Sequence, residues 1–377
     1  MGIQLTACSK NENRVKSVEN VLSDSLFMLV GSYASANEEG IKLFAFDQEK
    51  GVARYVNGLT GVDNPSYLTP RSDGKRVYAV SENDAFSSKA TALSMDLTTG
   101  ELAILNSKFT QGAAPCHIAI SPQEDFVLTA NYNGGNISIF GCDSNGELME
   151  PRVISFIGHG HDPIRQDKPY LHNIGFTPDG IYTFAVDLGS DCIHVFPINQ
   201  QNKRVTAPFL DEDKPASFAL PSGCGPRHVC FSPDHKTAYL ITELSGEVFV
   251  FSYEGKQTKI IQTIKADTLG ARGSADIHPS PDGRYVYASN RLKGDGIAIF
   301  KVNPEDGTLK KVGYQLTGIH PRNFVISPNG KYLLVACRFS NEIQIYRRDE
   351  TTGLLKYTGK SIHTKEPTCL KFVERNL

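Results

Sequence analysis

Several features that would identify a partner or a compartment are missing from this sequence. Its 377 residues hold 39 Lys and Arg against 41 Asp and Glu, a formal net charge of -2, so it carries no electrostatic footprint for DNA or RNA. No run of eighteen apolar residues occurs, so no segment is expected to span a bilayer. No Walker or dinucleotide fingerprint occurs either, and Asn133-Gly134-Gly135 is typical of a hairpin turn rather than a phosphate-binding loop.

The eight cysteines lack the spacing of a disulfide framework or a zinc site, because no Cys-x-x-Cys pair occurs. Five of them lie in or beside apolar runs and are predicted to be buried in a reduced protein: Cys116, Cys192, Cys230, Cys337 and Cys369. Leu5-Thr6-Ala7-Cys8 resembles a bacterial lipobox, but too few residues precede it to form a signal peptide. We therefore expect a cytoplasmic protein, with a lipid anchor to the cell envelope through Cys8 as the alternative.

The sequence does contain an internal repeat. Its turn residues are 47 to 56 positions apart: Gly74, Glu124, Gly180, His235, Gly283 and Gly330. A period of this size is typical of β-propeller blades. In each unit a short strand leads through a Pro-Asp-Gly-like turn into a second apolar strand, and two further strands follow, which is the four-stranded blade.

The two ends of the chain complete the last blade. Residues 367–373 form a first strand with nothing after it, whereas the segment from Phe27 begins at a second strand. We therefore predict an all-β, seven-bladed propeller with four antiparallel strands per blade, closed by the C-terminal strand joining the N-terminal blade. The predicted domain is 26–377, and residues 1–25, which are polar and without periodicity, are predicted to be a flexible leader.

One face of such a ring gathers the ionisable residues. The start of the first strand and the end of the second strand lie side by side in each hairpin, while the opposite face receives the repeated turns. Convergent ionisable side chains are the default hypothesis for an active site. Strand starts supply His117, His172, Arg227, His228, Asp276 and Arg322, and strand ends supply Glu82, Asp187, Glu243, Asn290, Arg291 and Arg338.

Several motifs on this face occur in a family-specific order. They are Arg165-Gln166 followed by Pro169-Tyr170-Leu171-His172, Asp187-Leu188-Gly189, Gly225-Pro226-Arg227-His228 followed by Glu243-Leu244, Ser289-Asn290-Arg291, and Pro321-Arg322-x-Phe324. As a set they resemble the lactonase-type seven-bladed propellers, the family of the propeller 6-phosphogluconolactonases and of the fungal carboxy-muconate lactonizing enzyme. Two positions depart from the family pattern: Tyr170 replaces its first His, and Thr242 replaces the Asn before the glutamate.

The resemblance implies hydrolysis of a sugar lactone, with 6-phospho-D-glucono-1,5-lactone as the leading substrate and no cofactor or metal. It implies four catalytic residues: His172, Arg227, Glu243 and Arg291. The other polar residues expected to bind substrate are His228, Asn290, Arg322, Arg338, Asp187 and Arg165.

Hydrolysis of an ester needs a base for water, a stabiliser for the oxyanion and a proton for the leaving alkoxide. We expect Glu243 to activate water and His172 to exchange the proton near neutral pH. One of Arg227 and Arg291 would stabilise the oxyanion and the other would hold the phosphate; the sequence leaves open which.

Structural alternatives apply to the same residues. Arg227, Arg291 and Glu243 could form ion pairs between blades, since Arg is the preferred residue for such pairs. Asp187 could hold a loop or orient His172. Residues 158–162, Gly-His-Gly-His-Asp, are interpreted as a solvated loop rather than a metal site.

Two rival functions remain at this point. One is a muconate-type cycloisomerase, in which these groups would move a proton and bind carboxylates. The other is a binding scaffold without activity, because a fold does not establish a function. The absence of tryptophan, and so of a Trp-Asp signature, argues against a WD-repeat scaffold. The sequence makes no prediction of oligomeric state.

Overall fold

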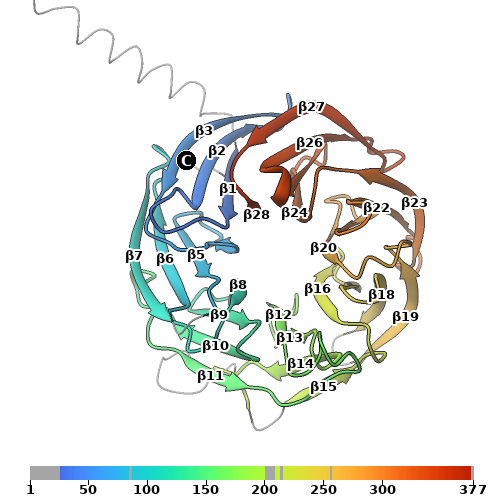
Figure 1. Ribbon diagram of the computed structural model, residues 1–377, viewed down its shortest axis with the longest axis horizontal. Coiled ribbons are helices and arrows are strands. Elements are labelled where there is room, and N and C mark those ends of the chain that lie inside the picture. Colours follow the sequence, from blue (N-terminus) through green and yellow to red (C-terminus); the bar gives the residue numbers. More distant parts are fainter. Residues whose placement is uncertain (1–25, 85–86, 200–208, 213–214, 255–256, 375–377) are drawn as a thin grey trace, which may run out of the picture.

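The computed structural model describes residues 26–84, 87–199, 209–212, 215–254 and 257–374. The expected leader, residues 1–25 with Cys8, lies outside the described residues. The strands form seven four-stranded antiparallel sheets that stand around a common axis (Figure 1), which confirms the predicted propeller. No helix among the described residues is long and apolar enough to cross a membrane.

The blades are given from the inner to the outer strand. Blade 1 is β28 (Pro367–Val373), β1 (Leu26–Ser32), β2 (Ile41–Asp47) and β3 (Val52–Leu59); blade 2 is β4 (Leu68–Pro70), β5 (Arg76–Ser81), β6 (Lys89–Met95) and β7 (Leu102–Phe109); blade 3 is β8 (Pro115–Ile120), β9 (Phe126–Asn131), β10 (Asn136–Gly141) and β11 (Arg152–Ser155); blade 4 is β12 (Leu171–Phe176), β13 (Tyr182–Asp187), β14 (Cys192–Pro197) and β15 (Ala216–Ala219). Blade 5 is β16 (Pro226–Phe231), β17 (Thr237–Thr242), β18 (Glu247–Glu254) and β19 (Gln257–Lys265); blade 6 is β20 (Ser274–Pro279), β21 (Tyr285–Asn290), β22 (Gly296–Val302) and β23 (Leu309–Leu316); blade 7 is β24 (Pro321–Ile326), β25 (Tyr332–Cys337), β26 (Glu342–Arg348) and β27 (Leu355–His363). A 3-10 helix, η1 (Arg338–Ser340), follows β25.

The ring is closed by the C-terminal strand, as predicted. β28 pairs antiparallel with β1, with Val30 opposite Leu370 and Leu29 opposite Lys371. In Figure 1 the red end of the chain lies beside its blue beginning. Because this pairing supplies blade 1 with its inner strand, the edge of β1 is not left open.

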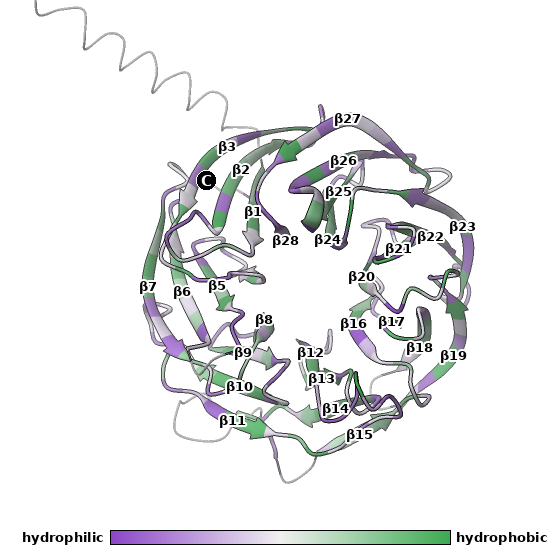
Figure 2. Ribbon diagram, viewed as in Figure 1, coloured by the Kyte–Doolittle hydropathy of each residue, from purple (hydrophilic) through white to green (hydrophobic). Residues whose placement is uncertain are grey.

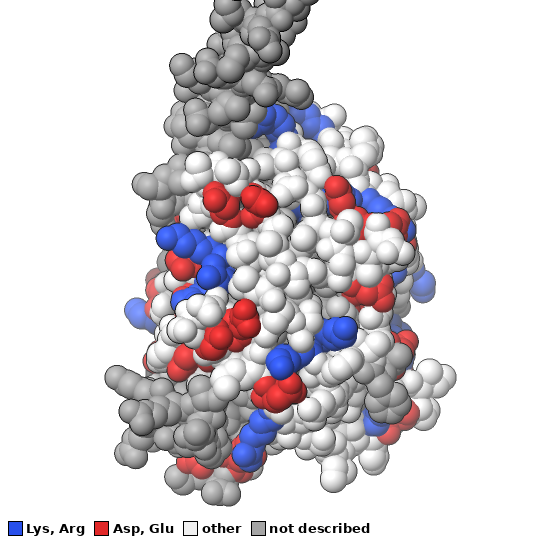
Figure 3. Space-filling model, turned by 90° about the vertical axis from the view of Figure 1, so that its left-hand side faces the viewer, with Lys and Arg blue, Asp and Glu red and all other residues white. Residues whose placement is uncertain are grey.

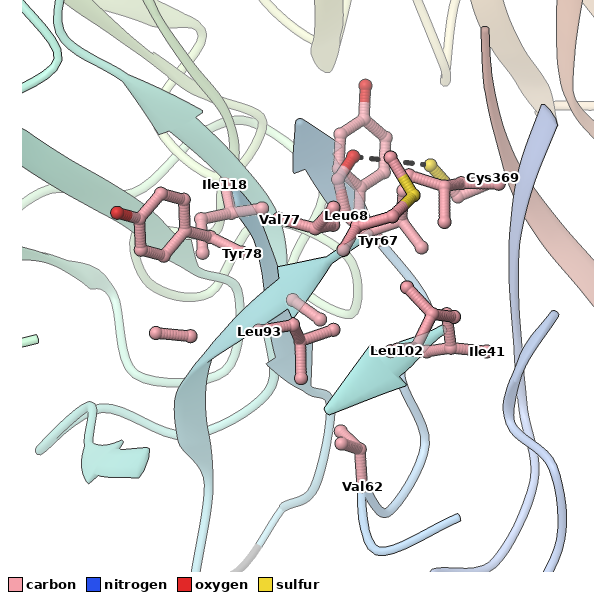
Figure 4. Close-up of a cluster of buried hydrophobic side chains, with 14 of the residues drawn as sticks. Ile41, Val62, Tyr67, Leu68, Val77, Tyr78, Leu93, Leu102, Ile118 and Cys369 are labelled. Carbon is pink, nitrogen blue, oxygen red and sulfur yellow. Dashed lines mark hydrogen bonds between the residues drawn. The ribbon is translucent and has the colours of Figure 1, made fainter. Parts of the chain in front are cut away.

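The apolar core lies between the blades. Each blade packs both of its sheet faces against neighbours, so the second strands are buried on both sides and read as continuous apolar runs such as 77–80, Val-Tyr-Ala-Val. One such cluster joins Leu68 and Tyr78 of blade 2 to Ile118 of blade 3 and Cys369 of blade 1 (Figure 4). Coloured by hydropathy, the blades show green segments between purple and white ones (Figure 2).

The repeated turns lie at the end of each hairpin opposite the ionisable residues; we call this side the turn face. The six turn residues all have positive φ, from 58° at Glu124 to 75° at Gly330. His235, which is not a glycine, has φ 62°. A neighbouring hydroxyl and acid fix these turns, as where Ser232 Oγ donates to Asp234 over 2.6 Å. On the side of the ring seen in Figure 3, acidic and basic residues are interspersed, in keeping with the small net charge.

Candidate active site on the charged face

Inner strands carry a β-bulge close to their first residue. The pairing register shifts between Pro115 and His117, Leu171 and Asn173, Pro226 and His228, Ser274 and Ile277, and Pro321 and Asn323. A bulge leaves a residue out of the ladder and re-aims its side chain. His172, Arg227 and Arg322 are such residues. The resulting end of the ring, opposite the turn face, is called the charged face.

Glu243, directly after β17, is the centre of this face. Its Oε1 accepts from Arg165 Nη2 over 2.6 Å, and its Oε2 accepts from Arg227 Nε and Arg291 Nη2 over 3.0 Å each. Burial alone would raise the pKa of Glu243, but the charges of Arg291, Arg227 and Arg165 outweigh burial and lower this pKa to about 2. The carboxylate is therefore ionised and fully engaged.

This arrangement argues against the sequence-based expectation that Glu243 is the base. A base must accept a proton from water, and both oxygens of this carboxylate already accept hydrogen bonds from guanidinium groups. The same contacts suit an anchor that orients Arg165, Arg227 and Arg291 towards one point.

Backbone carbonyls before and at the start of β20 fix two of these arginines further. Arg227 Nη1 donates to the carbonyl oxygen of Ala275, and Arg291 Nε donates to that of Gly273 over 2.8 Å. Both arginines are buried. Their guanidinium planes are thus held from two sides, by a carboxylate and by main chain.

His228 links Arg227 to a buried acid. Its Nε2 lies 3.3 Å from Arg227 Nη1 and its Nδ1 lies 2.8 Å from Asp276 Oδ1. A guanidinium only donates, so Nε2 accepts and Nδ1 carries the proton towards Asp276. Burial and the charge of Arg227 lower the pKa of His228 to about 4, so the ring is neutral at physiological pH. His228 is therefore held as a support for Arg227.

His172, the bulged residue of β12, lies beside this group. Its Nδ1 is 3.7 Å from Cys116 Sγ, and its ring packs edge-on against Tyr132 at 5.4 Å and His228 at 5.3 Å between centroids. Burial, and then the charge of Arg227, lower the pKa of His172 well below its usual value. A neutral imidazole is the form that can accept a proton.

Arg322 and Arg338 belong to a second group on the same face. Arg322 Nη2 lies 3.6 Å from Glu82 Oε2. Arg338 pairs with Glu366 over 2.8 Å and stacks on Tyr33, with its Cζ 4.0 Å from the ring centroid. The charged face thus has a Glu243 group on blades 4 to 6 and an Arg322 group on blades 7, 1 and 2.

Two residues predicted to bind substrate make hydrogen bonds within the protein itself. Asp187 is fully buried and accepts from the amides of Tyr170 and Gly189 over 2.7 and 2.9 Å. Asn290 bonds to Ser274 Oγ over 2.6 Å and to the carbonyl oxygen of Ala266. Both hold loops of the charged face, the role that the sequence left open as the alternative for Asp187.

The loop at 158–162 acts as a support as well. Asp162 Oδ1 accepts from the amide of Arg165 over 3.0 Å, and its other oxygen pairs with Arg272. The loop thereby fixes the segment that carries Arg165. Within the part of the chain that the structure describes, no three His, Cys, Asp or Glu side chains gather in a way that could hold a metal ion.

Sequence reasoning missed Tyr33 and Ser66. Tyr33 follows β1 as Glu243 follows β17, and Ser66 stands one residue before Tyr67, in the position that Cys116 has before His117. Aligning the seven units by their second strands would have found both. The position of Tyr33 in the repeat was not recognised because its blade is assembled from the two ends of the chain.

The fold and this face define a seven-bladed propeller with a buried His, Glu and Arg cluster at one end of the ring. The chain belongs to the family described as lactonase, 7-bladed beta-propeller, whose profile matches residues 27–372. The family resemblance of the sequence motifs is therefore confirmed.

Individual relatives agree. The chain is 35% identical over 355 residues to a 6-phosphogluconolactonase of Bacillus subtilis (strain 168), covering 92% of this chain and 98% of the relative. It is 36% identical over 337 residues to a 6-phosphogluconolactonase of Formosa agariphila, covering 87% and 94%. Among solved structures, a Bacteroides fragilis protein has a TM-score of 0.90 at 49% identity, covering 93% of this chain and 99% of that one. The periplasmic gluconolactonase of Pseudomonas aeruginosa has a TM-score of 0.86 at 30% identity, also covering 93% and 99%.

Proposed function

We propose that this protein is a carboxylic ester hydrolase that opens a sugar lactone, converting 6-phospho-D-glucono-1,5-lactone into 6-phosphogluconate. Membership of the lactonase family and the relatives named 6-phosphogluconolactonase support this activity. The observation that carries it is the Glu243 group, in which three guanidinium groups converge on one carboxylate beside the neutral ring of His172.

The chemistry needs negative charge to be stabilised where it develops. When water adds to the lactone carbonyl, the carbonyl oxygen becomes an oxyanion, and fixed donors favour it most. Arg165 is the most exposed of the three arginines, with 36% of its side chain accessible, while Arg227 and Arg291 are buried and rigid. We infer that N–H groups of this set receive the oxyanion and that Glu243 keeps them in place.

The proton of the attacking water must be accepted by a residue other than these arginines. As water attacks, its proton passes to His172, whose neutral ring can accept it. When the tetrahedral intermediate collapses, the ring C–O bond breaks and the same proton passes to the leaving alkoxide, which becomes the hydroxyl of the open acid. The step balances without a cofactor.

The test compares substrates and a histidine variant. Rates above the buffer control are measured for 6-phospho-D-glucono-1,5-lactone, D-glucono-1,5-lactone and carboxy-muconate. For the lactone that is turned over, His172→Asn should lower kcat by about 10²–10⁴-fold, the usual contribution of a positioned acid or base. The matched control is His235→Asn, on the exposed turn face at a positive φ that Asn tolerates, and it should keep full activity.

Turnover of carboxy-muconate alone would replace the proposal with the cycloisomerase. No turnover of any of the three would favour the binding scaffold. Full activity of His172→Asn would show that the proton passes through another group.

The cytoplasm stays our proposal for location. It is supported by the seven described cysteines, all of which are free. The alternative of a lipid anchor depends on Cys8, which lies outside the described residues.

A further inference from the structure

Arg322 differs from the other arginines of the charged face in its lack of hydrogen bonds. Among the described residues none accepts a hydrogen bond from its guanidinium group, and its nearest carboxylate oxygen, Glu82 Oε2, lies 3.6 Å away. That oxygen already accepts a short hydrogen bond from Ser66 Oγ. The five N–H donors of Arg322 are therefore unused by the protein.

The other arginines of this face are engaged. Arg165, Arg227 and Arg291 donate to Glu243, and the last two also donate to backbone carbonyls. Arg338 donates to Glu366 Oε2 through Nε, and its Nη2 lies 2.8 Å from the same oxygen. An arginine already held in this way has fewer donors left for a ligand than Arg322 has.

Arg322 is also too buried to be hydrated like a surface arginine, because only 14% of its side chain is accessible. Donors that are withdrawn from water and left without partners are costly, so this position favours an anion that can take them. The flanking blades place small side chains at the matching point of their inner strands, Ala275 in β20 and Thr368 in β28.

Tyr33 lies next to Arg322, and its hydroxyl interacts with Glu82. The ring centroid of Tyr33 lies 5.6 Å from Arg322 Cζ. Burial raises the pKa of Tyr33 well above its usual value, so the hydroxyl keeps its proton. The guanidinium fork of Arg322 is the arrangement that suits a tetrahedral oxyanion.

We propose that Arg322 binds the phosphate group of the substrate, with Tyr33 beside it, and that the Glu243 group receives the lactone ring. This inference rests on the proposed function and deepens it, because it gives the two ends of the substrate separate residues. It replaces the sequence-based expectation that Arg227 or Arg291 holds the phosphate.

The experiment has a kinetic and a binding arm. Arg322→Met removes the charge at similar volume, Arg322→Lys keeps the charge without the fork, and Arg54→Met on the exposed outer strand β3 is the control. For each protein, KM and kcat are measured with 6-phospho-D-glucono-1,5-lactone and with D-glucono-1,5-lactone. Binding of inorganic phosphate is measured by titration calorimetry, and folding is checked by melting temperature.

Arg322→Met should raise KM for the phosphorylated lactone about 10- to 100-fold, the size of a lost charge-assisted hydrogen bond. It should lower kcat/KM for the phosphorylated lactone far more than for the unphosphorylated one, and it should lose the binding of inorganic phosphate. Arg322→Lys should fall between, and Arg54→Met should match the wild type.

An equal loss of kcat with both lactones would overturn the proposal, because Arg322 would then serve the reaction. Binding of inorganic phosphate by Arg322→Met as tight as by the wild type would overturn it too. If the wild type hydrolyses neither lactone, the proposed function fails, and the calorimetric arm still decides whether Arg322 forms the anion site. If Arg322→Met does not fold, the same comparisons are made with Arg322→Lys.

Discussion

The two faces of the ring lie at opposite ends of the same seven inner strand pairs and yet differ in how far the blades resemble one another. On the turn face the same type of turn recurs. Each turn has a residue of positive φ, and a hydroxyl often bonds to a neighbouring acid or amide, as in Ser280 with Asp282 and Ser327 with Asn329. On the charged face the matching inner-strand positions hold seven residues of widely different chemistry: Ser66, Cys116, His172, Arg227, Ala275, Arg322 and Thr368.

This contrast separates what the fold needs from what the site needs. A tight turn can be built in few ways, so blades 2 to 7 use nearly the same one, whereas the inner strands of blade 1 come from the two ends of the chain. A bulged residue at the other end is free of the strand ladder, and each blade can supply a different side chain there. In a repeat protein, positions where the repeat fails on an otherwise regular frame are therefore the first candidates for function.

The largest effect on stability is expected from a substitution of Glu243, at the centre of the charged face. Glu243→Gln would leave three guanidinium groups, two of them buried, without their counter-ion. We expect a loss of about 3–5 kcal/mol in the free energy of unfolding, the usual cost of an uncompensated buried charge, and loss of most lactonase activity. Urea unfolding and steady-state kinetics measure both.

The turn face offers the matched control for this change. Glu124 pairs with one arginine, Arg71, over 2.9 Å, and both side chains are partly exposed. Glu124→Gln should therefore cost no more than about 1 kcal/mol and leave activity intact. Added inorganic phosphate should restore stability to Glu243→Gln by supplying negative charge. Wild-type stability of Glu243→Gln, with only kcat reduced, would return the role of base to this residue.

A smaller effect is expected from pH. The folded protein keeps the pKa of His228 at about 4, below its unfolded value of 6.5, so between these values the unfolded chain binds more protons. The stability that comes from the neutral ring is present above pH 6.5 and is lost as pH falls towards 4, by about 3 kcal/mol for this one group.

Hydrogen exchange at pH 5 sharpens the comparison. Amides near His172 and His228 on the charged face should lose protection before those of the turn face, where hydrogen bonds from Ser232 and Ser280 help to lower the pKa of Asp234 and Asp282. His228→Asn removes the titrating ring and should flatten the fall in stability between pH 6.5 and 4. Equal loss of protection on both faces would contradict the assignment.

The smallest expected effect belongs to the turn face. Gly283 has φ 69°, and a Cβ there would lie 3.6 Å from Pro233, an ordinary contact. Gly283→Ala should therefore cost only its backbone strain, about 1–2 kcal/mol, because the equivalent turns already hold Glu124 and His235. Melting temperature and kcat/KM together check this, since activity should not change.

The fold could be predicted because the same strand and turn pattern occurs several times along the sequence. Six turns at intervals of 47 to 56 residues fixed the number of complete units, and the unpaired strand at 367–373 required closure on the first blade. Each inference depended on local chemistry, on turn residues and apolar runs, which a sequence displays directly.

The site was only partly predictable for a different reason. Position in the repeat placed Glu243, Arg227 and Arg291 on one face, and they meet there at 3.0 Å. The role expected of Glu243 did not follow from position, because its proton affinity depends on how many arginines reach it. Arg165 lies 78 residues earlier in a loop, and its contact with Glu243 could not be read from spacing.

The sequence by itself determined the seven-bladed ring, its closure and the face on which ionisable residues gather, since hairpin geometry is local and repeats. Only the tertiary structure decided which charges neutralise one another. It pairs three arginines with Glu243 and places His228 in hydrogen-bond contact with Asp276. It leaves Arg322 without a hydrogen-bonding partner among the described residues. Such pairing joins side chains from different blades, and electrostatic energy depends on distance and burial in space, which no spacing along the chain records.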